Sequence, residues 1–154
     1  MTDYRVIIAG SRSFNDYELL REQCLSILQE KMRTHRVVIV SGHARGADSL
    51  GERFAKEFSL PFELHPAKWR LLGKAAGMVR NAEMAKCSDA LIAFWDGESS
   101  GTRHMINFAR KRGLEVSVIN TTLNNWIDNN SQTTERNTIV PPNEEELSIK
   151  CCHR

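Results

Sequence analysis

The sequence predicts an α/β fold, a Rossmann-like three-layer sandwich with a mostly parallel sheet of five strands or slightly more. Strand-like and helix-like segments alternate through residues 1–120, and such alternation builds a parallel sheet with helices on both faces. The strand-like segments are continuous apolar runs, which is the pattern of strands that are covered on both sides. Residues 1–120 are therefore expected to form one domain.

The first half of the chain predicts two strand–helix pairs. The first strand spans residues 5–9, and Asn15 or Asp16 can cap the helix that follows it. The second strand spans residues 37–40, and another helix follows. The apolar residues at helical spacing are Tyr17, Leu20, Cys24 and Leu28 in the first helix and Ala47, Leu50, Phe54 and Phe58 in the second.

The second half predicts three further strands and two helices. Residues 61–64 form a short strand, and residues 73–87 form a helix despite an internal glycine. The segment 90–95 is entirely apolar, so we expect it to be a central strand. A helix begins near Gly101 and stops at Gly113, and the last strand spans residues 115–119.

The composition changes after Asn120. Residues 121–138 are rich in Asn, Thr, Gln and Ser, and an acidic run follows Pro141 and Pro142. We expect residues 121–154 to form a polar C-terminal extension that is partly docked and partly flexible. Trp126 and Ile127 are the residues expected to dock it.

Charge and hydropathy argue against several classes of protein. The net charge is only +2, which disfavours a protein whose main task is to grip a nucleic-acid backbone, although a local basic face stays open. No run of about 18 apolar residues is present, so no membrane span is expected. The N-terminus lacks the ordered segments of a signal peptide. We therefore expect a cytoplasmic protein.

The cysteines do not predict a metal centre. Cys24 and Cys87 lie in helical patterns and are expected to be small buried apolar residues. Cys151, Cys152 and His153 could bind a metal, but no second ligand cluster has suitable spacing. We expect no metal and no required cofactor.

Three glycine-containing loops follow predicted strands. Because every loop from the carboxyl end of a parallel strand emerges at the same edge, these loops are expected to meet there and form a ligand pocket. The candidate residues are Gly10, Ser11, Arg12, Ser13 and Phe14 in the first loop, Ser41, Gly42, Ala44, Arg45, Gly46 and Asp48 in the second, and Asp96, Ser99, Ser100, Gly101 and Thr102 in the third.

The chemistry of these loops favours a phosphate-bearing ligand. Glycine lets backbone approach a phosphate, helix N-termini offer N–H groups, hydroxyls add donors, and Arg12 and Arg45 add charge. A single loop of this kind is more often only a tight turn, but three of them at one edge favour a ligand-binding site. None matches the P-loop or the GxGxxG fingerprint.

Several residues have both a functional and a structural interpretation. Arg80, with Asn81 beside it, either points into the pocket or pairs with Glu83 on an exposed helix face. Trp69 and Trp95 could stack on a base, but such residues are more often core or rim aromatics. Asp48 could accept a hydrogen bond from a ribose hydroxyl or stabilise the first turn of its helix.

These same segments resemble the YspA-like branch of the SLOG superfamily over roughly residues 4–120. The motifs are Gly10-Ser11-Arg12, Val40-Ser41-Gly42 through Asp48, Pro66-Ala67-Lys68-Trp69, Gly73 through Gly77, Arg80-Asn81 with Met84, and Ala93 through Gly97 with Ser100-Gly101-Thr102. The resemblance implies a Rossmann-like SLOG domain over residues 1–120. It also implies a nucleotide or nucleotide-derived ligand, ADP-ribose-like or cyclic ones included, and self-association.

Two groups of relatives imply different functions. Lonely Guy phosphoribohydrolases share Gly101-Thr102 and Arg80, but their catalytic glutamate falls at Met105, so hydrolysis would need His104 or Glu98 instead. The Smf/DprA group, which loads recombinase onto single-stranded DNA, resembles residues 41–48 and Arg80-Asn81 and also presents a basic groove.

We therefore predict a sensor or sequestering module for a nucleotide-like molecule, and a homo-oligomer. The first alternative is a nucleotide hydrolase in which Arg80 stabilises charge and His104 acts as acid or base. The second is a single-stranded DNA-binding protein of the Smf/DprA type, whose basic residues would be Arg103, Arg110, Lys111 and Arg112.

Overall fold

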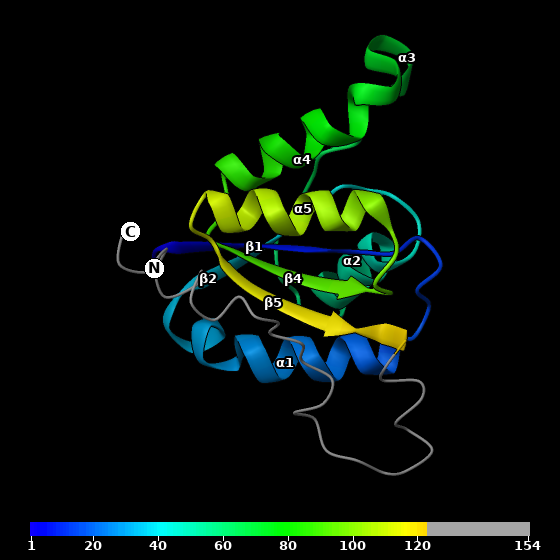
Figure 1. Cartoon of the computed structure of the whole chain (residues 1–154). Helices are drawn as coiled ribbons and strands as arrows, with labels where there is room; N and C mark the ends of the chain where they lie inside the picture. The colour runs from blue at the N-terminus through cyan, green and yellow to red at the C-terminus, as the bar shows by residue number, and fades with distance from the viewer. Residues whose placement is uncertain (123–154) are drawn as a thin grey trace.

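The computed structural model describes residues 1–122 and shows a five-stranded sheet in which every strand pair is parallel. The strand order is β3-β2-β1-β4-β5, so β1 is the middle strand and β4 lies beside it (Figure 1). The strands are β1 Asp3–Gly10, β2 Arg36–Ser41, β3 Phe62–Leu64, β4 Ala90–Trp95 and β5 Glu115–Asn120. The predicted fold class is confirmed.

Helices cover both faces of the sheet, because successive residues of each strand point to opposite sides. Val6 and Ile8 pack in the cluster that includes residues of α1 Tyr17–Thr34 and α2 Ala47–Glu57. Ile7 and Ala9 pack against α4 Ala76–Lys86 and α5 Ser100–Lys111. All four strand residues are buried, which explains the uninterrupted apolar run.

The strand order determines where a ligand can bind. Along the chain, β2 and β3 are added to one side of β1, and β4 and β5 to the other. The loops after β1 and β4 therefore leave the sheet in opposite directions, which opens a crevice at their carboxyl ends.

The segment before α4 differs from the prediction. The predicted helix over residues 73–87 begins only at Ala76, and two short elements precede it, α3 Trp69–Leu72 and the 3₁₀ helix η1 Gly73–Ala75. Gly73 has φ of 58°, a left-handed conformation that ends α3 and starts a new turn. These elements form an arm that projects beyond the sheet (Figure 1).

The two cysteines of the described residues differ in burial. Cys24 is buried as predicted, but Cys87 is exposed, so its predicted burial was wrong. Cys87 is the C-cap residue of α4 and lies past the last turn that packs on the sheet, with its thiol donating to the Met84 carbonyl. Asp16 caps α1 as predicted, accepting from the Leu19 N–H at 3.1 Å.

The predictions for Trp126, Ile127, Cys151, Cys152 and His153 concern residues outside the described part of the chain. Within residues 1–122, the helices are all too short or too polar to cross a lipid bilayer.

Candidate functional site

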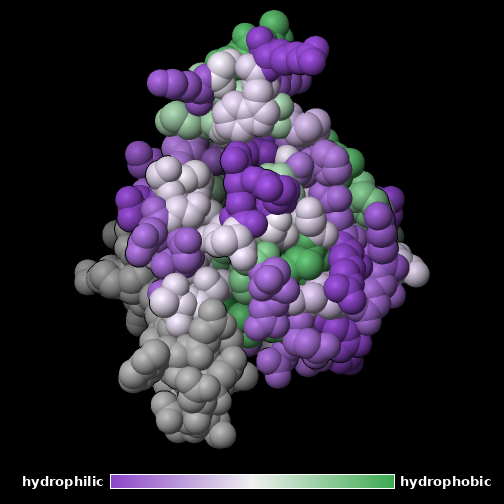
Figure 2. All heavy atoms as spheres, turned by 90° about the vertical axis from the view of Figure 1, so that its right-hand side faces the viewer, coloured by the Kyte–Doolittle hydropathy of each residue, from purple (hydrophilic) through white to green (hydrophobic). Residues whose placement is uncertain are grey.

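A pocket of about 890 Å³ lies at the carboxyl edge of the sheet. Ala9 at the end of β1, Met84 on α4 and Met105 on α5 supply apolar lining. Figure 2 views this edge and shows hydrophilic side chains around a hollow in which apolar residues are visible. A pocket of this volume can hold a molecule the size of a nucleotide.

The first turn of α5 presents backbone donors to this pocket. The carboxylate of Asp96 accepts from the N–H groups of Glu98 and Ser99, each at 2.8 Å, so those two donors are used within the loop. No side chain caps the N–H groups that follow, and the first turn holds no acidic residue. Gly101 is exposed, and a Cβ atom there would meet nothing within 4 Å. An anion can therefore approach this helix N-terminus closely.

Arg80 on α4 supplies positive charge to the pocket wall. Its Nη1 donates to the Gly42 carbonyl at 2.6 Å, and its Nε donates to the Asn81 side-chain oxygen at 3.2 Å. A Cβ on Gly42 would lie 2.5 Å from Nη1, so glycine is needed for the guanidinium to sit there. Burial lowers the pKa of Arg80, while the neighbouring Asp48 opposes that effect. Of the two interpretations given above for Arg80, the structure has the one in which it lines the pocket.

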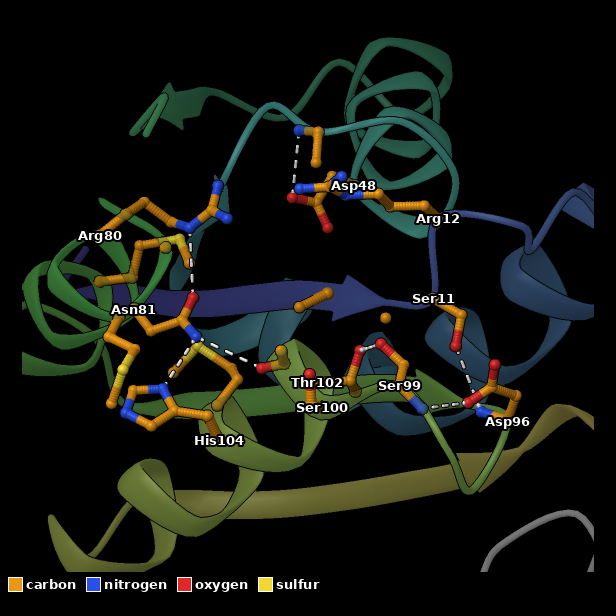
Figure 3. A pocket seen from close by; sticks show the side chains of 18 of the residues that line it. Ser11, Arg12, Asp48, Arg80, Asn81, Asp96, Ser99, Ser100, Thr102 and His104 are labelled. Atoms are coloured by element: carbon orange, nitrogen blue, oxygen red, sulfur yellow. Dashed lines mark hydrogen bonds between the residues drawn. The ribbon is translucent and has the colours of Figure 1, made fainter. Parts of the chain in front are cut away.

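Asp48 lies both in the first turn of α2 and at the pocket, where each of its two proposed roles would place it. It lies in the first turn of α2 and accepts the Ala44 N–H at 3.2 Å, so it stabilises the local turn. It also lines the pocket, and Figure 3 shows its second carboxylate oxygen directed inward, with Arg12 nearby. Burial raises the pKa of Asp48 to about 6, although the Ala44 hydrogen bond and Arg80 work against that rise.

Asn81 connects Arg80 to His104. Its side-chain oxygen accepts from Arg80, so its amide nitrogen is the atom 3.4 Å from the Gly101 carbonyl and 3.0 Å from Nδ1 of His104. Because that nitrogen donates, Nδ1 of His104 accepts, and the ring proton resides on Nε2. Burial, with a smaller effect of Lys111, lowers the pKa of His104. His104 is therefore neutral at neutral pH and offers Nε2–H as a donor.

The outer wall of the pocket carries an aromatic ring and two cations. Trp69 of α3 is 50% exposed, and the Arg12 guanidinium lies 5.9 Å from its ring centroid. Lys74 of η1 lines the same side. This wall has an exposed π-face for a planar group and positive charge beside it.

Most of the predicted residues meet in this pocket. Those that line it are Gly10, Ser11, Arg12, Ser13, Ala44, Asp48, Trp69, Arg80, Asn81, Asp96, Ser99, Ser100, Gly101, Thr102 and His104. Lys74, Gly77, Met78 and Met105 line it too but were not predicted to bind. Lys74 and Gly77 belong to the Gly73-to-Gly77 motif quoted above, which was the available signal for them.

The second loop contributes fewer residues to the pocket than predicted, because its polar groups are used in local hydrogen bonds and packing. Ser41 is buried, and its hydroxyl donates to Glu52 at 2.7 Å. Gly46 has φ of 80°, and a Cβ there would lie 2.3 Å from the Ser11 carbonyl, so this glycine packs two loops together. Arg45 is exposed and, like Ser41, Gly42 and Gly46, does not line the pocket.

Two predicted aromatic ligands lie elsewhere. Phe14 is buried and stacks on Phe94, with ring centroids 5.2 Å apart. The Trp95 indole donates to the Ser99 carbonyl at 3.0 Å, and Arg103 lies over its ring. Trp95 thus stabilises the loop before α5 and does not line the pocket.

Comparisons with known proteins identify the family. The model of the YspA, cpYpsA-related SLOG family matches residues 4–71. The chain is also 38% identical over 118 residues to the Gene 61 protein of Mycobacterium phage D29, covering 73% of this chain and 93% of that protein. The chain belongs to the YspA, cpYpsA-related SLOG family.

Solved structures share the fold of this SLOG-family chain. TM1055 matches with a TM-score of 0.53 at 16% identity, over 75% of this chain and 72% of that one. DNA processing protein A from Streptococcus pneumoniae matches with a TM-score of 0.57 at 17% identity, over 99% of this chain. The chain spans only 55% of that protein's length. The single-stranded DNA-binding DNA processing protein A from Helicobacter pylori matches with a TM-score of 0.53 at 17% identity, over 99% of this chain and 80% of that one.

The pocket of this SLOG-family member lacks a glutamate among the described residues that line it. Met105, at the position where the resemblance to phosphoribohydrolases implies one, is buried and lines the pocket. Glu98 is exposed and lies outside the lining. The carboxylates that line the pocket are those of Asp48 and Asp96. Burial acts to raise the pKa of Asp96, but its hydrogen bonds from the loop outweigh burial and lower it.

Proposed function

We propose that this SLOG-family protein binds a nucleotide or nucleotide-derived ligand and acts as a sensor or sequestering module. The observation that carries the proposal is the uncapped N-terminus of α5 in the same pocket as Arg80. The helix N-terminus would hold a phosphate through backbone N–H groups, and Arg80 would add charge.

The remaining lining suits the rest of a nucleotide. Asp48 can accept a hydrogen bond from a ribose hydroxyl, and His104 can donate one through Nε2. The exposed face of Trp69 can stack on a base, with the Arg12 guanidinium alongside. The pocket volume of about 890 Å³ leaves room for a second phosphate or sugar, which is why cyclic and ADP-ribose-like ligands belong in the test.

Calorimetry across a panel tests this proposal. The panel contains adenosine, AMP, ADP, cyclic AMP, ADP-ribose and inorganic phosphate, with guanine and cytosine analogues. At least one phosphate-bearing compound should bind, and its nucleoside should bind at least about 10-fold more weakly. Arg80→Met should weaken binding about 10- to 100-fold. Arg112→Met is the matched control, because Arg112 is exposed at the C-cap of α5, away from the pocket lining. Binding that is absent across the panel refutes the proposal.

Hydrolysis of a nucleotide is a second candidate, favoured by one observation. Asp48 lines the pocket with a pKa raised to about 6, the property of a general acid near neutral pH. Arg80 would stabilise the charge of the departing group. Neutral His104, with its proton on Nε2, can donate but is not set up to remove a proton there. Release of free base from a nucleoside monophosphate, lost in Asp48→Asn, would support this candidate, and intact substrate after long incubation would exclude it.

Single-stranded DNA binding has less support. Arg110, one of the four basic residues considered for it, is buried, so it is not part of a solvated basic face. Exposed Trp69 does lie between Lys68 and Arg70, a pattern that can stack on a base and contact phosphates. Retention of a labelled oligothymidylate that falls steeply with salt would favour this role. We expect no retention at physiological salt.

We also propose that the protein self-associates through an apolar patch on the arm before α4 and on the first turn of α4. Apart from Met1, the exposed large apolar residues of the described chain all lie within residues 64–79, and Leu71 is 77% exposed. A patch of this kind usually marks an interface. A second copy is the proposed occupant, because Trp69 and Met78 belong to both the patch and the pocket lining. Covering the patch would enclose a bound ligand.

A further inference from the structure

A cluster of metal-binding side chains lies outside the nucleotide pocket. Glu63 of β3, His65 just after it and Cys87 at the end of α4 each offer one ligand atom, and these atoms lie within 4.8 Å of one another. Neither these residues nor Glu83 line the pocket. We propose that this cluster binds a zinc ion, a site separate from the proposed function.

The ligand set fits zinc in particular. Zinc accepts thiolate sulfur, imidazole nitrogen and carboxylate oxygen, usually in a tetrahedral arrangement. Magnesium and calcium prefer oxygen ligands alone. Tetrahedral zinc places its ligand atoms about 3.3–3.8 Å apart, so small side-chain rotations would close the cluster. Cys87 is exposed, which leaves the fourth position open to water.

The surroundings orient two of the ligands. Arg5 pairs with Oε2 of Glu63, so the other oxygen, Oε1, is the one near His65, 3.8 Å from its Nε2. The second ring nitrogen of His65, Nδ1, lies 3.8 Å from a carboxylate oxygen of Glu83. A carboxylate behind a histidine is the usual outer partner of a zinc ligand, because it fixes the ring and raises its basicity.

Regular secondary structure fixes the backbone positions of His65, Cys87 and Glu83. The His65 N–H donates to the Ser41 carbonyl at 2.8 Å, which continues the pairing of β3 with β2 and fixes the backbone at His65. Cys87 and Glu83 belong to the C-terminal end of α4 and its cap.

The charges of the zinc-bound cluster would cancel. Glu63, Glu83 and a Cys87 thiolate supply three negative charges, and Arg5 supplies one positive charge. A bound Zn²⁺ brings the sum to zero. The ion would join β3, a three-residue edge strand, to the helix that carries Arg80.

Zinc titration against a chromophoric chelator tests the proposal. The full-length chain is used with Cys151, Cys152 and His153 replaced by Ser, Ser and Ala, so that the tail contributes no ligands. One zinc per chain should bind with Kd below about 1 µM. Cys87→Ser and His65→Ala should each weaken binding at least about 100-fold, and Glu83→Gln about 10-fold. His35→Ala is the matched control, because His35 contacts Thr34 and belongs to no part of the cluster.

Cobalt provides an independent readout. Co²⁺ bound at the cluster should show a thiolate-to-metal absorption band that disappears in Cys87→Ser, while the circular dichroism and melting of that variant stay unchanged. Replacing an exposed thiol by a hydroxyl should not disturb folding. The proposal is overturned if the tail-substituted chain binds no zinc, or if Cys87→Ser and His65→Ala bind it as tightly as their parent.

Discussion

Asp48→Asn should change how the stability of the protein depends on pH. Asp48 is 5% exposed, and burial raises the pKa of its carboxyl from 3.8 to about 6. A carboxyl whose pKa is raised by folding favours the folded state most when it is protonated. Its contribution is therefore fully present below the unfolded pKa of 3.8 and is lost as the pH rises through about 6.

The size of this effect follows from the shift. One pKa unit corresponds to about 1.4 kcal/mol, so the whole change is on the order of 3 kcal/mol. Between about pH 4.5 and pH 7.5, the contribution of Asp48 to the free energy of unfolding should fall by roughly 2 kcal/mol. The amide that replaces the carboxyl cannot titrate, so the variant lacks this contribution. His104 shifts in the opposite sense, but it is present in both proteins and cancels in the difference.

Urea unfolding of both ligand-free proteins at several pH values gives the comparison. The free energy of unfolding of the parent, minus that of Asp48→Asn, should fall by about 2 kcal/mol as the pH rises across this window. Parallel pH profiles for the two proteins would refute the reasoning, because they would mean that the Asp48 carboxyl is not desolvated.

Four further predictions concern ligand affinity, packing and assembly. Gly42→Ala should lower ligand affinity at least about 10-fold in calorimetry by displacing the Arg80 guanidinium, while chemical denaturation should show a cost below about 1 kcal/mol. Gly46→Ala should instead lose about 3 kcal/mol in the same denaturation assay, because Gly46 has a positive φ and backbone atoms would crowd an added Cβ. Equal stability of the Gly42→Ala and Gly46→Ala variants would contradict this contrast. Phe54→Ala should cost about 3–5 kcal/mol, since the ring is fully buried between α2 and the sheet, and a loss below about 1 kcal/mol would show that the core is packed differently. Leu71→Asp should convert an oligomer to a 17.5 kDa species in light scattering, whereas a parent protein that is already this size would remove the proposed interface.

Much of the fold follows from local patterns. The central strands were predictable because residues covered on both faces must be apolar, as residues 6–9 of β1 and Ala90–Trp95 of β4 are. The first helix was predictable from the spacing of its apolar residues and from Asp16 at its start. The crevice followed from parallel topology, which requires the loops after β1 and β4 to share one edge.

The failures of sequence reasoning have physical causes as well. Ser41 and Gly46 have the chemistry of phosphate ligands, but the loop uses their hydrogen-bonding and packing capacity internally, which only three-dimensional contacts reveal. The burial of Arg110 and the exposure of Cys87 depend on which turn of a helix packs on the sheet. Glu63 and Cys87 lie far apart in the chain, so no spacing rule brings them together.

Native mass spectrometry of the protein purified from cells, followed by denaturation and identification of any released molecule, tests the central claim most directly. A pocket built to hold a phosphate-bearing ligand should retain it, so we predict one nucleotide or nucleotide derivative per chain, lost in Arg80→Met and kept in Arg112→Met. A chain that carries no such molecule, and that also takes up none when the whole nucleotide panel is added before the measurement, would contradict the claim.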